Sequence, residues 1–429
     1  MPRFLVGATA DTWDFDAAYD AAKDGDIIEF TPNLTMNFTK EPFTEITKNI
    51  TIIGHVEGNT FLNTITGKIR VSNKAKVTFQ NLWMTVLENS NMFRITGESE
   101  VTFENCVLQS EFPANEHFLL FSEEKSKVNF KQLTTKLPDK HQLGMKFVQS
   151  AVSIQDSTIQ NRLWIRENSE LTFVRSKMEC SRPTSLWIED SKLSILSSQV
   201  SGTFEGGTQA VLNASKSEIM IEDSLIQGVG KDYYTIYLQE SCTGVFNDLN
   251  VDFMKLKSSH IRMVNGSVKY NLAIDGDSTL YSQGRLRFLN KESQHIPISL
   301  STNALFVGDS VEVEKETSTI IRVKEGSCFV ANDFIHLNGD ATKLNYEIDE
   351  ISQCSITQKH KVAPERSEKG EIIRTENEQK APQTNTDYYA ELQGLIGLKT
   401  VKEKVDKLIQ QAKYNQLQIE QGLPPEKMT

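Results

Sequence analysis

A five-residue phrase that recurs roughly every 23 residues restricts the possible folds of this chain more than any other feature. Each copy begins with a small polar residue and then places two apolar residues around a central one, as in Ser99-Glu100-Val101-Thr102-Phe103. The first apolar residue, the anchor, is Val101, Val128, Val152, Leu171, Leu193 or Ile219 in the clear copies, and Val77, Thr243, Ile261, Leu280, Leu305, Phe329 or Cys354 in the weaker ones. Such a period is typical of a solenoid, in which each repeat stacks on the next.

The alternation inside the phrase indicates a strand. Apolar residues two positions apart lie on one side of an extended chain, whereas a helix needs spacings of three and four. A polar residue four positions after each anchor indicates a bend, and an inward-facing candidate returns three positions later. The polar positions are Asn81, Asn105, Gln132, Asp156, Arg175, Ser197 and Asp223, and the inward candidates are Met84, Leu108, Ile159, Met178, Val200 and Ile226, with Thr135 in the equivalent place.

A turn of this length has room for three short strands and their corners. The sequence therefore predicts an all-β fold, a right-handed parallel β-helix of about 13 rungs, over residues 1–357. A β-sandwich is the alternative, since its strands also recur at short intervals. A sandwich, however, does not restart the same phrase a dozen times.

The start of the chain predicts a cap for this solenoid. Residues 15–23 carry apolar side chains at the spacing of a short amphipathic helix, and the strand-like segments Gly25-Asp26-Ile27-Ile28 and Ile50-Thr51-Ile52-Ile53-Gly54 follow. This order resembles the start of pectin-lyase-like β-helix proteins. The resemblance implies that the helix covers the open end of the core, where apolar side chains and strand edges would otherwise meet water.

Composition limits the compartment and the partners. No apolar run reaches the roughly 18 residues of a membrane span, and residues 1–8 are too short for a secretory signal. We therefore expect a cytoplasmic protein without a membrane span. The cysteines Cys106, Cys180, Cys242, Cys328 and Cys354 are widely spaced, which favours small core residues over a disulfide framework or a zinc site. A formal net charge of −11 argues against a nucleic-acid partner.

The character of the chain changes near its C-terminal end. Residues 358–387 are charged, contain Pro364 and Pro382 and have few apolar side chains, so we expect a flexible linker. Residues 388–429 contain a strongly amphipathic helical pattern, with Val401, Val405 and Leu408 on its apolar face. Periodicity alone favours an oligomerisation helix there.

The residues of this last segment resemble a more specific module. Leu392-Gln393-Gly394-Leu395-Ile396-Gly397-Leu398-Lys399-Thr400-Val401-Lys402, followed later by Gly422-Leu423-Pro424, is similar to the first helical segment of an AAA+ ATPase. The group in question contains stage V sporulation protein K, the red-type rubisco activase and the ATPases of type VII secretion systems. The resemblance implies that Ile396, Gly397 and Leu398 bind the adenine side of an incomplete nucleotide pocket. For a full-length parent protein it implies ATP and magnesium as cofactors and a homo-hexamer.

The family pattern is incomplete in this chain. The phosphate-binding loop, G-x-x-x-x-G-K-[ST], does not occur in the sequence. Because that loop holds the phosphates, we do not expect these 429 residues to hydrolyse ATP, and we assign them no catalytic residue, metal ligand or cofactor. We expect a truncated piece of a longer ATPase, with a natural truncation as the alternative.

Two functions follow from these observations. We expect the β-helix to be a non-catalytic recognition or scaffold domain that binds a protein substrate or adaptor, through loops such as 111–117, 137–143 and 202–208, for ATP-driven remodelling linked to secretion. The alternative is a polysaccharide lyase or glycosidase that acts on acidic polysaccharide. The strand Leu186-Trp187-Ile188-Glu189-Asp190 is similar to the W-I-D-H strand of pectate lyases, but Ser191 stands where the histidine would be.

Overall fold

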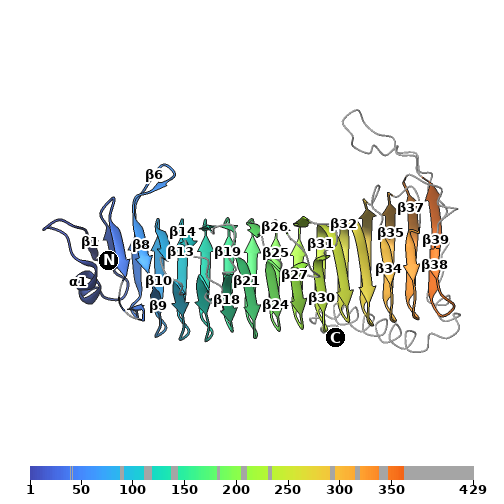
Figure 1. Cartoon of the computed structure of the whole chain (residues 1–429), viewed down its shortest axis with the longest axis horizontal. Coiled ribbons are helices and arrows are strands. Elements are labelled where there is room, and N and C mark those ends of the chain that lie inside the picture. Colours follow the sequence, from blue (N-terminus) through green and yellow to red (C-terminus); the bar gives the residue numbers. More distant parts are fainter. Residues whose placement is uncertain are drawn as a thin grey trace, which may run out of the picture. The chain divides into compact units, whose positions relative to one another are not determined.

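The computed structural model of the chain describes residues 1–361, except residues 39, 41, 87–90, 111–117, 137–143, 181–183, 204–209, 230–233, 290–294, 315–318 and 338–345. The described residues form a right-handed parallel β-helix of about 13 turns with almost no helix. The strands lie side by side along a rod, and the short helix α1 (Phe15–Ala21) lies at the end where the chain begins (Figure 1). The fold predicted from the repeated phrase is confirmed.

Each turn has three faces, which we call A, B and C in the order in which the chain passes through them. Face A begins with β1 (Arg3–Val6), β2 (Ile27–Phe30), β5 (Ile50–Ile53), β10 (Lys76–Gln80), β13 (Glu100–Glu104), β16 (Lys127–Lys131), β19 (Ala151–Gln155), β22 (Glu170–Val174), β25 (Lys192–Leu196) and β28 (Glu218–Glu222). Face B begins with β3 (Thr35–Phe38), β8 (Thr64–Gly67), β11 (Trp83–Val86), β14 (Val107–Ser110), β17 (Thr134–Lys136), β20 (Thr158–Ile159), β23 (Lys177–Cys180), β26 (Gln199–Thr203) and β29 (Leu225–Val229). Face C contains β4 (Thr44–Ile46), β9 (Ile69–Val71), β12 (Phe93–Ile95), β15 (Leu120–Ser122), β18 (Gly144–Val148), β21 (Arg162–Arg166), β24 (Leu186–Glu189), β27 (Ala210–Ser215), β30 (Tyr234–Gln239), β34 (Ile298–Leu300), β36 (Ile321–Val323) and β38 (Tyr346–Ile348).

Longer strands continue the three faces toward the other end of the rod. β31 (Thr243–Lys257) and β32 (His260–Asp275) each run through all three faces. β33 (Thr279–Phe288), β35 (Leu305–Val313), β37 (Cys328–His336) and β39 (Gln353–Lys361) cover faces A and B. A separate antiparallel hairpin, β6 (Val56–Glu57) with β7 (Thr60–Phe61), projects from the rod near its beginning (Figure 1).

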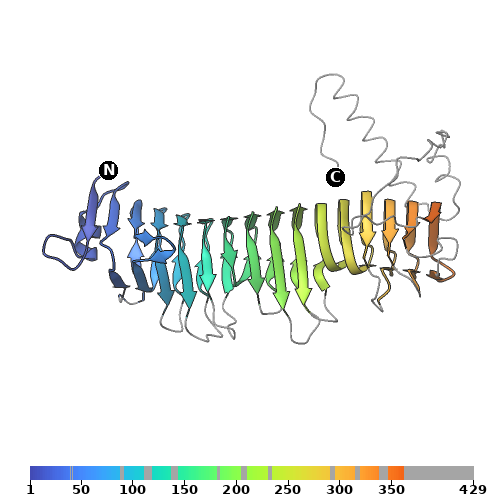
Figure 2. The ribbon, with the colours of Figure 1, turned by 90° about the horizontal axis from the view of Figure 1, so that it is seen from above.

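Pairing between successive turns is parallel and in register. Leu171 pairs with Val152 on one side and with Leu193 on the other, and Leu193 pairs in turn with Ile219. Side-by-side stacking repeats along the rod, as the view from above shows (Figure 2), with register shifts between β31 and β32, β32 and β33, and β33 and β35. A sandwich would join its strands in antiparallel pairs, so the parallel ladder excludes that alternative.

The anchors of the phrase form the core of the rod. Val101, Val152, Leu171, Leu193 and Ile219 are all buried, as predicted. Phenylalanines two positions after the anchors stack on one another inside face A, with ring centres 5.5 Å apart for Phe79 and Phe103 and 5.4 Å apart for Phe103 and Phe130. The offset stacking of these rings adds to the energy of burial.

The chain bends between faces A and B at the polar positions, as the sequence predicted. All seven of these residues have positive φ, from 43° at Arg175 to 59° at Asn81. Left-handed backbone bends the chain sharply, and asparagine and aspartate adopt it more readily than most residues. The inward candidates after the bend, including Thr135, are all buried.

Two of the weaker anchors were wrong by one residue. Ile219 pairs with Gly244 and not with Thr243, and Leu280 pairs with Phe306 and not with Leu305. A one-residue shift moves a side chain from the core to the outside of a strand. The core position at 244 accepts only glycine, since a Cβ there would lie 2.6 Å from the carbonyl oxygen of Ile219. The apolar pattern is therefore interrupted at that turn.

The two ends of the rod differ in how well the sequence predicted them. The predicted cap is present: α1 buries Phe15 and Ala18, and the ring of Phe15 contacts that of Phe38, with ring centres 4.7 Å apart.

At the other end of the rod, β39 extends to Lys361, so residues 358–361 belong to a strand and not to the predicted linker. They pair with residues 333–336 of β37. Lysines are common on terminal strands because charge discourages further pairing.

Candidate functional site

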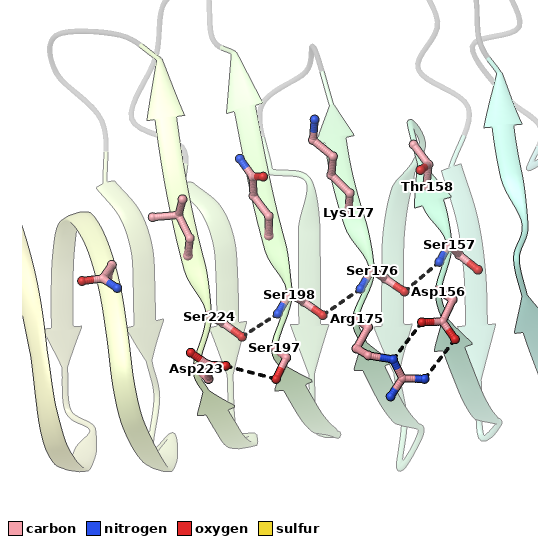
Figure 3. Close-up of a pocket in the computed structure, with 13 residues that line it drawn as sticks. Asp156, Ser157, Thr158, Arg175, Ser176, Lys177, Ser197, Ser198, Asp223 and Ser224 are labelled. Carbon is pink, nitrogen blue, oxygen red and sulfur yellow. Dashed lines mark hydrogen bonds and ion pairs between the residues drawn. The ribbon is translucent and has the colours of Figure 1, made fainter.

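An open groove of about 700 Å³ lies at the corner between faces A and B. It is lined by residues 156–158, 175–177, 197–199 and 223–225 of four successive turns, together with Asn250 (Figure 3). The lining is polar because every turn places its left-handed corner residue here. The groove is thus a consequence of the repeat.

The serines of this groove hold the turns together. The backbone N–H of Ser157 donates to the Oγ of Ser176, that of Ser176 to the Oγ of Ser198, and that of Ser198 to the Oγ of Ser224, each at 3.1 Å (Figure 3). The hydroxyls of Ser176 and Ser198 donate in turn to carbonyl oxygens of their own turn at 2.8 and 2.7 Å. Each hydroxyl therefore accepts from a serine N–H at the bend and donates to a carbonyl oxygen that also accepts from a backbone N–H of the neighbouring turn. Nothing in the groove activates one of these hydroxyls as a nucleophile.

One ion pair crosses the groove. The guanidinium of Arg175 donates to both carboxylate oxygens of Asp156, at 2.8 and 2.9 Å (Figure 3). These hydrogen bonds, and the charge of the guanidinium, hold the pKa of Asp156 below the usual range of an aspartate. Both side chains are exposed, so the pair contributes little to stability.

We predict that Arg175→Gln raises the pKa of Asp156 toward its ordinary value. The pair stabilises the fold only while Asp156 is ionised, so its contribution is present above the ordinary pKa of aspartate and is lost as the pH falls through the lowered value. The carboxyl ¹³C shift of Asp156, followed against pH by NMR, measures this change. Lys192→Gln, which removes a cation that pairs with Glu218, is the control and should leave the pKa of Asp156 unchanged.

The second candidate is a line of outward-facing side chains on face C, which we call the aromatic row. One residue from each of seven successive turns lies directly beside the next: Phe121, Lys146, Trp164, Trp187, Asn213, Tyr237 and Lys255. At the usual strand spacing of about 4.8 Å, the row is roughly 29 Å long. It belongs to strands β15, β18, β21, β24, β27, β30 and β31, which hold it straight and rigid.

Two rings of the row contact each other, and the rings of the row remain accessible. The ring centres of Trp164 and Trp187 are 6.2 Å apart, and Phe118 lies 5.3 Å from Trp164 at a steep angle. Trp187 is 40% exposed, and Phe121, Trp164 and Tyr237 are half-buried. Aromatic residues are enriched where proteins bind partners.

Cations lie over these rings. The Nζ atom of Lys146 is 5.6 Å from the ring centre of Phe118 and 5.5 Å from that of Phe121. Lys255 lies in the same way 5.1 Å from Tyr234 and 5.6 Å from Tyr237. Attraction between an ammonium and the face of a ring holds each lysine beside its rings. The row therefore combines flat apolar surface with fixed positive charge.

The residues predicted from the sequence to carry function are not in this row. Ile396, Gly397 and Leu398 lie outside the described residues, as do loops 111–117 and 137–143 and all but the first two residues of 202–208, which belong to β26. Glu189 of the lyase-like strand pairs with Arg166 at 2.6 Å. Asp190 occupies the corner after β24 with a φ of 48°.

Sequence reasoning missed the row, although a signal was present. Trp164-Ile165 and Trp187-Ile188 are the same dipeptide, separated by one period of the repeat. Both isoleucines are buried, so both tryptophans must face outward on the same side of neighbouring turns. The other members of the row are not recognisable without knowing which strands share face C.

The described part of the chain offers neither a metal site nor a reactive core cysteine. No group of three or more histidine, cysteine, aspartate or glutamate side chains there is arranged to hold a metal ion. No helix among the described residues is long and apolar enough to cross a bilayer. Burial raises the pKa of the Cys106 thiol to about 12, which suppresses its thiolate and its reactivity. Cys106, Cys180 and Cys242 are core residues, as predicted.

Comparisons with protein-family models, with curated proteins and with solved structures found no match to this chain. Among the described residues, the aromatic row is the surface whose chemistry the fold explains least.

Proposed function

We propose that the β-helix is a recognition rod that binds a partner protein through the aromatic row, and that it is the N-terminal substrate- or adaptor-binding domain of an AAA+ ATPase. The observation that carries the first part is the row itself, in which Trp164, Trp187 and Tyr237 face outward on one rigid face. Core packing does not require outward aromatic rings, and a cross-strand aromatic pair adds only roughly 0.2–1 kcal/mol to strand pairing, so binding is the stronger explanation of their alignment.

The chemistry of the row matches that of protein-binding hot spots. Tryptophan and tyrosine contribute much of the binding energy of protein interfaces, because their large rings bury much area at a small cost in side-chain entropy. The row is roughly 29 Å long and one residue wide, so it would contact a partner along a narrow line. Its rigidity further reduces the entropy lost on binding.

The second part of the proposal rests on the resemblance of residues 392–424 to the first segment of an AAA+ ATPase. In that arrangement the linker connects the rod to a motor, and the rod selects what the motor remodels. A homo-hexameric parent would carry six rods. Several weak contacts on one partner would then add up to a much higher avidity. ATP and magnesium would be bound by the ATPase core and not by the rod.

Site-specific photo-crosslinking tests the recognition function. A benzophenone amino acid replaces Trp187 in cells that normally make the protein, and we expect irradiation to link position 187 to one discrete protein. The matched control is Tyr281 on face A, which is 45% exposed against 40% for Trp187. Trp164→Ala should abolish the adduct at 187. Equal adducts at both positions, or none at 187, would refute binding through the row.

The coding sequence tests the ATPase assignment. We expect it to continue past codon 429 into a G-x-x-x-x-G-K-[ST] loop within about one further domain, roughly 250 residues. The longer product should assemble with ATP and magnesium. A coding sequence without that loop contradicts this part of the proposal and leaves the recognition function standing.

A further inference from the structure

Four arginines of face C have their charge compensated by carboxylates of the rod, and a fifth, Arg162, lies 5.6 Å from the ring centre of Trp164. Arg70 faces Glu45 at 3.8 Å, Arg94 faces Glu123 at 2.8 Å, Arg166 faces Glu189 at 2.6 Å and Arg322 faces Glu347 at 2.6 Å. In each case the partner lies on a neighbouring turn of the same face. The rod therefore supplies a carboxylate to each of these four arginines.

Lys146 and Lys255 depart from this pattern. Neither forms an ion pair with any residue that the structure describes, and each is held over aromatic rings. This is notable in a chain whose formal net charge is −11. Two uncompensated ammonium groups thus mark the row, one near each end, with Trp164, Trp187 and Tyr237 between them.

From this arrangement we infer that the aromatic row binds an acidic polypeptide segment in extended conformation, with its apolar side chains on Trp164 and Trp187 and its carboxylates at Lys146 and Lys255. The inference rests on the proposed recognition function and names the chemistry of the partner. Carboxylates of the partner would pair with Lys146 and Lys255, as carboxylates of the rod pair with four arginines of face C.

The spacing of the two lysines defines the segment. Five steps of register separate Lys146 from Lys255, through Trp164, Trp187, Asn213 and Tyr237. At about 4.8 Å a step they are roughly 24 Å apart, a distance that an extended chain covers in about seven residues. A segment along the row would therefore present two acidic residues about seven positions apart with apolar residues between them.

Another exposed apolar line, on face A, does not support an equally specific inference. Met220 and Val245, on β28 and β31, are 39% and 40% exposed and lie side by side, and Tyr281 on β33 is 45% exposed and follows after Arg262 of β32. The one cation in this line, Arg262, donates to Gln283 at 2.7 Å. No charge there selects a partner, which makes face A a suitable source of control variants.

Binding of a defined peptide to the full chain tests the inference. The probe is a fluorescein-labelled peptide of eleven residues with glutamates at positions 2 and 9 and leucine, proline and serine between them, followed by fluorescence anisotropy. We expect saturable binding that weakens at least tenfold when lysines replace the glutamates. Because two ion pairs contribute, binding should also weaken steeply as the salt concentration rises.

Variants locate the binding on the row. The pair Lys146→Ala and Lys255→Ala should weaken binding at least fivefold, and Trp187→Ala at least tenfold. Lys76→Ala with Lys127→Ala, and Tyr281→Ala, are the matched controls on face A and should change it less than twofold. Circular dichroism and the melting temperature of each variant establish that the rod is intact.

The outcomes separate this inference from the proposed function. Absence of saturable binding, equal affinity for both peptides, or equal loss in the face A controls would overturn it. Binding of polygalacturonate or of an oligothymidylate that is lost in the lysine variants, without binding of the acidic peptide, would instead assign the row to a polysaccharide or a nucleic acid. A protein adduct at Trp187 without acidic-peptide binding would preserve recognition and remove only the acidic partner.

Discussion

Leu193→Asp is expected to destabilise the rod by at least about 4 kcal/mol. Leu193 is 1% exposed and pairs between Leu171 and Ile219, so the new carboxyl group would have no water and no partner. The loss combines roughly 2 kcal/mol of apolar burial with several kcal/mol for a buried polar group. Urea unfolding followed by circular dichroism measures it.

The damage should be local, because each turn of a solenoid contacts only its neighbours. Hydrogen exchange should lose protection in β22, β25 and β28, while strands near α1 keep theirs. The control is Ser194→Asp, one residue along β25 and facing outward, which should change stability by less than about 0.5 kcal/mol. Equal unfolding midpoints for the two variants would mean that position 193 does not face the core.

Phe103→Ala should cost about 3–5 kcal/mol. Phe103 is fully buried between the stacked rings of Phe79 and Phe130, and the ring of Phe93 meets it edge-on at 4.9 Å. Removing the ring leaves a cavity that the surrounding strands, fixed by their pairing, can close only in part. The same urea experiment gives the change in the free energy of unfolding.

A graded series distinguishes packing from other effects at this position. Phe103→Leu keeps most of the volume and should cost roughly 1 kcal/mol. Thr102→Ala, on the outward side of β13, should have little effect. If Phe103→Ala were as mild as Phe103→Leu, the larger loss of apolar area and the cavity would have no cost, and Phe103 would not be packed in the core as described.

These core variants also bear on recognition. The aromatic row is aligned only because the turns beneath it are in register, and the register depends on the anchors, the phenylalanine ladder and the serine hydrogen bonds of the corner. A partner that binds across seven turns therefore contacts a surface whose geometry depends on the packing of the core. Variants that loosen one turn should weaken binding to the row even when they lie on another face.

Local pattern was sufficient to predict the fold of the rod. The period of two within the phrase identified the inward anchors, and the polar residue four positions later identified the bend, because both properties depend on a few neighbouring residues. The same reasoning failed where the pattern is interrupted. At Gly244 the core position has no side chain, so the anchor was placed at Thr243, and polar residues 358–361 join β39 through pairing that composition does not indicate.

The aromatic row depended on tertiary structure. Its members come from seven turns, and the intervals between them vary with the length of the connections, so spacing in sequence does not align them. Strand alternation alone indicates that Trp187 faces outward, since Ile188 faces the core. That Lys146 lies over Phe121, that Lys255 lies over Tyr237 and that neither meets a carboxylate among the described residues follows only from the stacking of complete turns. Where the alternation is unbroken, the sequence thus determined which way a side chain faces, because that depends on neighbouring residues. The closure of each turn decided which side chains meet.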